Sequence, residues 1–167
     1  MTAVVSTVKD ASVTVAGEVV GAVDGNRDGA GRGALLALVG AGREDGPDAW
    51  RTVARKIAEL RLLVPAGQTE DAEDAGASGT VRRDAGAQDN GAEVLVVSQF
   101  TLMGSTAKGR RPSWAAAAPG PDAETAINLI VEELRRRGLR VETGRFGAMM
   151  AVATTNDGPY TVIVEAS

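Results

Sequence analysis

Two short apolar runs place the strongest limit on the fold of this chain. Residues 34–39 read ALLALV and residues 93–97 read EVLVV, with hardly a polar side chain in either run. A strand that exposes one face alternates apolar and polar residues, whereas a strand buried on both faces is continuously apolar. We therefore expect two central strands with other structure packed on both of their faces, which is typical of an α/β sheet.

Two amphipathic segments are predicted to form the covering helices, over residues 48–60 and 122–137. Asp122 is the predicted N-cap of the second helix, and Gly138 is predicted to end it behind three arginines. Each of the two helices has an apolar stripe, formed by Trp50, Val53, Ala54, Ile57 and Leu60 in the first helix and by Ile127, Ile130, Val131 and Leu134 in the second. The fold class is thus α/β, with mixed sheets, two main helices covering one face, and 167 residues in a single domain.

The remaining strands are predicted from Val- and Thr-rich segments. Residues 3–8 and 11–15 are expected to pair with residues 18–23 in a hairpin that turns at Ala16-Gly17. Residues 62–64 read as a short strand, and residues 24–33 as a glycine-rich loop. Three strands close the chain over residues 139–143, 148–154 and 160–164, with a turn at residues 156–159 between the last two.

Residues 65–90 are predicted to form a flexible insertion in the domain. This segment holds six acidic and two basic residues, which accounts for the whole net charge of −4, and Val81 is its one large apolar side chain. Such a composition cannot bury enough surface to hold one conformation.

The chain contains no cysteine and no histidine. Disulfides, thiolate chemistry, Ser-His-Asp arrangements and the usual zinc sites are therefore excluded, and we expect no metal or cofactor. Any hydrolysis must use hydroxyls, carboxylates, main-chain dipoles or a group of the substrate. No apolar run approaches the ~20 residues that cross a bilayer, and the first residues do not read as a signal peptide, so we expect a cytoplasmic protein.

Two stretches could carry chemistry. Ser98, Gln99, Phe100 and Thr101 follow a buried strand, which is where α/β folds commonly bind ligands, although spacing alone favours a strand that leaves the core with its polar residues satisfied by neighbouring main chain. A basic loop with Lys108, Arg110 and Arg111 follows, and arginine forks suit phosphate oxygens, although a solvated loop has the same composition.

Taken in order along the chain, six segments resemble the D-aminoacyl-tRNA deacylase family. They are residues 11–15 (ASVTV), 17–21 (GEVVG), 93–102 (EVLVVSQFTL), 108–113 (KGRRPS), 143–148 (TGRFGA) followed by Met150, and 156–161 (NDGPYT). The resemblance implies a homodimer with its active sites at the subunit interface, which hydrolyses the ester of D-aminoacyl-tRNA and of glycine mischarged on a non-cognate tRNA. It also implies that the Gly158-Pro159 peptide is cis and reaches into the partner's pocket, where its main chain excludes L side chains.

The resemblance also assigns site residues. The catalytic stretch is Ser98, Gln99, Phe100 and Thr101, in which main-chain amides near Phe100 and Thr101 bind the developing negative charge and a hydroxyl of the terminal adenosine assists the attacking water. Without a histidine to deprotonate it, Thr101 is expected to position groups rather than to attack. Substrate contacts are expected from Arg145, Phe146, Met150, Asn156, Gly158, Pro159 and Thr161, and tRNA contacts from Lys108, Arg110 and Arg111.

The sequence departs from the family's pattern in three places. Ser6-Thr7 stands where a glutamine-arginine pair is usual, the loop over residues 24–33 is longer, and the acidic insertion replaces a lysine-methionine-asparagine stretch. Two other functions stay open: an RNA-end binding protein without turnover, which the departures at residues 6–7 and 65–90 support, and an editing module for an L-amino acid on the same scaffold. The intact Gly158-Pro159 argues against the second of these.

Overall fold

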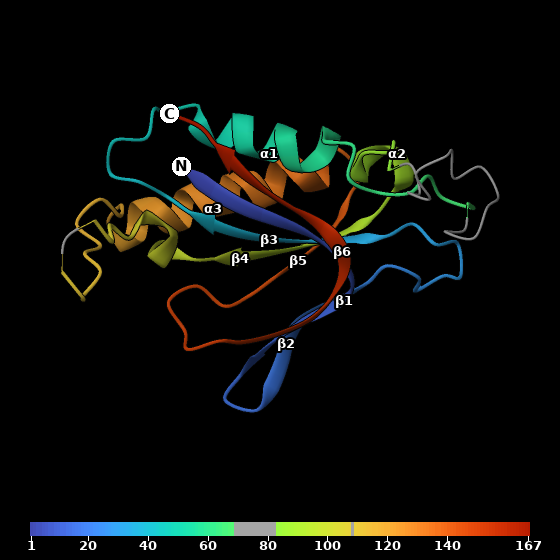
Figure 1. The fold of residues 1–167 in the computed structure, drawn as a ribbon, viewed down its shortest axis with the longest axis horizontal. Helices are drawn as coiled ribbons and strands as arrows, with labels where there is room; N and C mark the ends of the chain where they lie inside the picture. Colours follow the sequence, from blue (N-terminus) through green and yellow to red (C-terminus); the bar gives the residue numbers. More distant parts are fainter. Residues whose placement is uncertain (69–82, 108) are drawn as a thin grey trace.

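The protein folds into a six-stranded sheet with two long helices on one face (Figure 1). The structure, a computed structural model, describes residues 1–68, 83–107 and 109–167. The elements in chain order are β1 (Thr2–Val15), β2 (Glu18–Asp24), β3 (Ala34–Gly40), α1 (Ala49–Glu59), α2 (Ala87–Asn90), β4 (Glu93–Ser98), the 3-10 helix η1 (Phe100–Met103), α3 (Gly120–Arg136), β5 (Arg140–Thr143) and β6 (Ala151–Glu165). The predicted α/β class is confirmed. Among the described residues, no helix is both long and apolar enough to cross a membrane.

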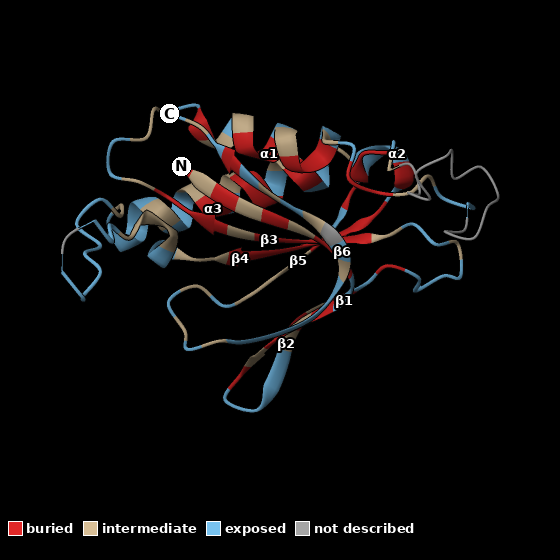
Figure 2. Cartoon of the chain, viewed as in Figure 1, coloured by how far each residue is buried: buried red, intermediate tan, exposed pale blue. Residues whose placement is uncertain are grey.

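The central strands β3 and β4 run parallel and are buried on both faces, as their apolar runs predict (Figure 2). Alternate side chains enter two separate cores, since successive residues of a strand point to opposite faces. On the helix side, Leu35 and Val94 pack with residues of α1 and α3 such as Ile57 and Leu134. On the other side, Leu36, Leu95 and Val97 pack with Val13, Val15 and Val23 of the hairpin.

The long strand β1 joins these two layers. Its first half pairs with β3 and its second half pairs with β2, while β6 runs along its other edge. The sheet curls until β2 lies against the end of β5, where a Cβ on Gly21 would overlap the carbonyl oxygen of Thr143. A glycine is therefore required at that close approach. The predicted hairpin is confirmed, with Ala16 and Gly17 both at positive φ, of 49° and 85°.

The predicted start of the second helix is wrong by two residues. Helix α3 begins at Gly120 with Pro119 as its N-cap residue, and Asp122 lies inside the first turn. Proline suits the start of a helix because it has no N–H group, and the first N–H groups of a helix have no partner within the helix. An acidic side chain in the first turn still interacts favourably with the helix dipole.

The predicted loop over residues 65–90 is wrong in its last part. Residues 69–82 lie outside the described residues, but α2 closes the segment, and Leu63 forms an isolated bridge with Ala85, which replaces the strand expected over residues 62–64. Asn90 is buried, and its amide nitrogen donates to the carbonyl oxygens of Arg32 and Val64 at 3.0 and 2.7 Å. Buried alanines and the hydrogen-bonded Asn90 amide hold residues 85–90 against the domain, although the composition of this segment alone does not predict any buried residues.

The predicted break between the last two strands is also wrong, because β6 continues through it. Val8 pairs with Asn156 and Ser6 pairs with Thr161, so residues 157–160 all lie opposite Thr7. Extra residues opposite one partner make a β-bulge, which bends a strand without ending it. We refer to residues 157–160 as the β6 bulge.

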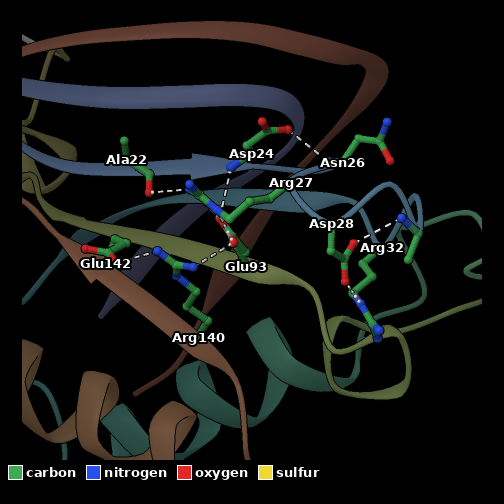
Figure 3. Close-up of polar contacts among 10 residues, drawn as sticks. Ala22, Asp24, Asn26, Arg27, Asp28, Arg32, Glu93, Arg140 and Glu142 are labelled. Carbon is green, nitrogen blue, oxygen red and sulfur yellow. Dashed lines mark hydrogen bonds and ion pairs between the residues drawn. The ribbon is translucent and has the colours of Figure 1, made fainter.

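Glu93 at the start of β4 holds the glycine-rich loop over residues 24–33 in place (Figure 3). Its carboxylate accepts hydrogen bonds from the Asp24 amide at 2.9 Å and from Arg27 Nε at 2.6 Å and Nη2 at 3.0 Å, and Arg140 lies 3.5 Å away. Burial raises the pKa of Glu93, but its hydrogen bonds with Arg27 and Asp24 and the nearby Arg140 charge more than offset this, so the pKa is lowered.

Candidate active site

A cavity of about 260 Å³ lies where the chain leaves the carboxyl end of β4. Ser98, Gln99 and Phe100 form one side of it, and Phe146 closes it from the loop before β6. The opposite wall comes from the start of α3 and the residues before it, where small side chains leave the space open: Ala117, Ala118, Gly120 and Ala123. The structure therefore brings four of the predicted site residues together around one opening.

The local turn that presents these residues is built by main-chain hydrogen bonds. The Gln99 amide donates to the carbonyl oxygen of Val39 at 2.7 Å, and the Leu102 amide then donates back to Gln99 at 3.1 Å. Gly40 permits this approach, since a Cβ there would lie 2.8 Å from the Gln99 carbonyl oxygen.

The turn leaves two main-chain donors free. Among the described residues, no acceptor pairs with the N–H groups of Phe100 and Thr101, the first two residues of η1. The leading N–H groups of a helical turn have no partner within it. They can therefore donate to an oxygen that develops negative charge beside the cavity.

The side chains of this stretch are open to solvent. Gln99 Nε2 donates to the Thr101 hydroxyl, which lies on the exposed side of η1. Phe100 is 58% exposed, and its ring meets Trp114 edge to face, with centroids 6.0 Å apart and an interplanar angle of 62°. Trp114 is a site residue that the sequence analysis missed. Its one signal is that an uncommon aromatic directly follows the basic loop, in a chain with only five aromatic residues (Trp 2, Tyr 1, Phe 2).

The basic loop rises from the same end of the sheet (Figure 1). Ser105 and Ser113 close it through paired main-chain hydrogen bonds of 2.8 and 3.0 Å. Arg110 and Arg111 are exposed on the loop, while Lys108 lies outside the described residues. The loop thus offers two guanidinium groups to solvent near the aromatic pair of Phe100 and Trp114.

Two of the predicted substrate contacts lie away from the cavity. Arg145 is exposed and reaches Glu18 of the hairpin at 3.8 Å. Met150 packs beside the core formed with the hairpin, and its sulfur fills the space next to Gly144, where a Cβ would lie 2.6 Å away. Neither side chain lines the cavity, so in this segment Phe146 is the predicted residue that the structure brings to it.

The β6 bulge lies at the opposite end of the sheet. Val8 pairs both with Asn156 of β6 and with Ala34 at the start of β3, whereas Ser98 pairs with Val39 near the end of β3. Five residue steps along β3 amount to about 16 Å. The structure therefore does not bring Asn156, Gly158, Pro159 or Thr161 to the cavity of the same chain, and Thr161 shares a 3.0 Å hydrogen bond with Ser6 instead.

The arrangement can bind a carbonyl or a phosphate with hydrogen-bond donors rather than with a metal. Across residues 1–68, 83–107 and 109–167, no group of three or more acidic side chains is placed to hold a metal ion. The cavity is lined by an amide, a hydroxyl and two aromatic rings, and the two unpaired main-chain N–H groups belong to Phe100, which lines it, and to the next residue, Thr101. Such a set fits acyl transfer with oxyanion stabilisation and without a nucleophile activated by histidine.

Comparison with known proteins agrees with this chemistry. A family model described as D-Tyr-tRNA(Tyr) deacylase matches residues 4–165. Proteins named D-aminoacyl-tRNA deacylase from Corynebacterium urealyticum and Thermobifida fusca are 53% and 50% identical over 170 and 165 residues, with 99% of each chain covered in both cases.

Solved structures share the fold. One titled "c-Myc DNA Unwinding Element Binding Protein" is 34% identical with a TM-score of 0.80, and the match covers 100% of this chain and 99% of that one. A second, titled as a probable eukaryotic D-amino acid tRNA deacylase, has a TM-score of 0.73 over 99% of this chain and 100% of its own, and at 14% identity it shows likeness of fold alone.

Proposed function

Because this chain belongs to the D-Tyr-tRNA(Tyr) deacylase family, we propose that its 260 Å³ cavity is the site at which it hydrolyses D-aminoacyl-tRNA. The family resemblance predicted from the ordered motifs is confirmed, and the protein is an enzyme of translation proofreading. One observation supports the cavity most directly: two unpaired main-chain N–H groups stand beside Ser98 and Gln99 at its rim. Charged tRNA is present in the cytoplasm, which is where we place this activity.

The reaction needs no activated side chain. Water attacks the ester carbonyl carbon, and the N–H groups of Phe100 and Thr101 donate to the oxygen as it becomes negative. The bond to the ribose oxygen then breaks, this oxygen takes the proton that the attacking water gives up, and the free D-amino acid leaves with the water's oxygen in its carboxylate. An aminoacyl ester is already reactive, so positioning and charge stabilisation supply the acceleration. Thr101 accepts a hydrogen bond from Gln99 and so serves as a positioning group.

The β6 bulge is assigned to a second copy of the chain. About 16 Å of strand separates it from the cavity of its own subunit, so it can complete a site only in another subunit. An isologous homodimer would bring each bulge to the partner's cavity. The exposure of β6 supports this interface, since residues 151–156 are all exposed and Ile163 is 69% exposed.

Selection of the D isomer follows from exclusion by main chain. Gly158 is exposed, and apart from its two chain neighbours no atom of the described residues lies within 4 Å of the position of a Cβ. A main-chain wall of this kind can take the space that an L side chain needs, while it admits hydrogen at the same position. Glycine has no side chain to exclude, so glycyl-tRNA mischarged on a non-cognate tRNA is also a substrate.

The basic loop and the aromatic pair are assigned to the acceptor end of the tRNA. Arg110 and Arg111 form forks that match phosphate oxygens, and Lys108 adds a point charge. Phe100 and Trp114 offer exposed rings on which an unpaired base can stack. Together they suit a single-stranded end rather than a duplex.

Two matched substrates test the proposal. Purified protein is incubated with tRNA charged with D-tyrosine or with L-tyrosine, and ester loss is followed against the uncatalysed rate. We expect rapid loss of the D ester while the L ester persists. Equal loss of both esters would contradict the exclusion mechanism. Binding of charged tRNA without any ester loss would support an RNA-end binding protein instead.

A further inference from the structure

We propose that Arg83 is a positioning residue that holds the β6 bulge in the shape required for chiral selection. This inference rests on the proposed role of Gly158 and Pro159 in the partner's site. Arg83 lies on the segment before α2, and neither its position nor its neighbours in sequence suggest a link to β6.

Arg83 contacts both ends of the bulge at once. Its Nη2 atom lies 3.0 Å from Oδ2 of Asp157, and its guanidinium carbon lies 4.8 Å from the centre of the Tyr160 ring. Its Nη1 atom donates to the carbonyl oxygen of Leu62 at 3.4 Å, which ties the guanidinium to the layer below. The Arg83 side chain is only 4% exposed and that of Asp157 is 27% exposed, so the ion pair is shielded from solvent on the arginine side.

Besides Arg83, the side chain that contacts both ends of the bulge is Thr7, whose hydroxyl lies against the carbonyl oxygens of Asp157 and Tyr160. Residues 157–160 face the single residue Thr7, so they lack the ladder of partners that orders the rest of β6. Apart from its chain neighbours, no described residue places an atom within 4 Å of the Cβ side of Gly158. Anchoring at Asp157 and Tyr160 therefore sets the path of the two residues between them.

An arginine suits this task better than a lysine. The planar guanidinium can donate to a carboxylate along its edge while its face lies over an aromatic ring. A lysine can keep the charge opposite Asp157, but it cannot make both contacts with fixed geometry. A charged pair shielded from solvent also loses much free energy if one partner is removed, which makes the position of Asp157 sensitive to Arg83.

Two of the sequence departures meet at this bulge. Thr7 and Arg83 belong to the two segments in which the resemblance expects other residues, residues 6–7 and the acidic insertion over residues 65–90. In the structure Thr7 contacts the bulge from the β1 side and Arg83 contacts it from the α2 side. The two departures thus form one structural unit around residues 157–160.

The test compares Arg83→Ala and Arg83→Lys with the control Arg61→Ala. Arg61 is a suitable control because it pairs with the adjacent Asp84 at 2.9 Å, is 70% exposed, and does not touch the bulge. Two measurements are made: hydrogen exchange of the amides of Asp157, Gly158, Tyr160 and Thr161, and the ratio of D- to L-tyrosyl-tRNA hydrolysis. We expect Arg83→Ala to speed the exchange and to lower the ratio by roughly ten- to a hundredfold, Arg83→Lys to lie between it and wild type, and Arg61→Ala to match wild type.

Exchange that stays at the wild-type rate in Arg83→Ala would overturn the inference, and so would faster exchange with an unchanged ratio. If Arg83→Ala folds poorly, Asp157→Asn removes the same ion pair with little change of shape and takes its place. If the wild-type enzyme cleaves neither ester, the proposed function fails, whereas faster exchange in the variant still supports the anchoring by Arg83. The two failures are thereby distinguished.

Discussion

The hydroxyl of Thr7 donates to the carbonyl oxygen of Asp157 at 2.5 Å and also lies 3.2 Å from that of Tyr160. Thr7 is fully buried at a point where β1 faces no regular partner on β6. One side chain thus contacts the main chain at both ends of the bulge, and its single hydroxyl hydrogen serves the carbonyl oxygen of Asp157 at the shorter distance.

Thr7→Val should destabilise the protein because it keeps the shape of the side chain but removes this donor. The part-buried carbonyl oxygens would lose this partner, which costs about 1–3 kcal/mol in the free energy of unfolding. Urea denaturation measures the loss, and Thr7→Ser is the matched control because it retains the hydroxyl. If Thr7→Val proves as stable as wild type, the hydroxyl does not satisfy the bulge.

Sequence patterns predicted the parts of this fold that depend on local rules. The runs ALLALV and EVLVV indicated β3 and β4 because burial on both faces removes the need for polar positions. Helical spacing indicated α1 and α3, and the positions of the hydroxyl and amide after β4 indicated the cavity rim. Each of these signals lies within one segment of the chain.

The features that were missed depend on contacts between distant segments. Asn156 to Pro159 reads as a turn, but pairing of both flanks with β1 carries the strand through it. Asn90 and Arg83 belong to a segment of acidic and small residues, and only their partners Val64 and Asp157 show that they are ordered. The edge-to-face contact of Trp114 with Phe100 similarly needs the fold of the basic loop.

A deletion that removes residues 65–90 should destabilise the domain strongly, contrary to expectation from composition. It would remove α2, the buried Asn90 and the bridge between Leu63 and Ala85. A deletion confined to residues 69–82, joined by a short glycine-serine linker, leaves those contacts in place and should cost less. Melting temperatures of the two deletions compare them directly. Equal losses would show that residues 83–90 add no stability.

Stability should depend on pH through Glu133. Hydrogen bonds from Arg136 and then Arg137 lower the pKa of this carboxyl from its ordinary value of 4.5 to about 2. A carboxyl with a depressed pKa stabilises the fold above its unfolded pKa and loses that contribution as pH falls through its folded pKa. Glu133→Gln should therefore lower the Tm by about 2–4 °C at pH 7.

The difference in Tm between wild type and Glu133→Gln should shrink below pH 4.5 and vanish near pH 2. Glu132→Gln is the control, since Glu132 is exposed on the same helix and forms no ion pair with any described residue. A difference that stays constant over this range would show that the ion pairs of Glu133 do not stabilise the fold.

Gly158→Ala should separate folding from catalysis. The added methyl group meets no atom of its own chain within 4 Å, and the φ angle of Gly158 is outside the left-handed region, so the Tm should stay at the wild-type value. In the partner's cavity the same methyl would occupy substrate space, so hydrolysis of D-tyrosyl-tRNA should fall at least about tenfold. Gly46→Ala, which adds a methyl with only ordinary contacts, is the control. Full activity in Gly158→Ala would show that the β6 bulge is not part of the active site.

Mixed subunits should restore activity if the bulge acts across the interface. Phe100→Ala alters the cavity but leaves the bulge intact, whereas Gly158→Ala does the reverse, so each homodimer has two defective sites. When the two variants are unfolded together and refolded in equal amounts, half of the dimers are mixed, and each mixed dimer has one site with both wild-type parts. Activity should therefore recover to about a quarter of wild type. If the mixture stays as inactive as the separate variants, the bulge does not complete a partner's cavity. Because about 16 Å of strand separates the bulge from the cavity within one chain, the two would then belong to different sites.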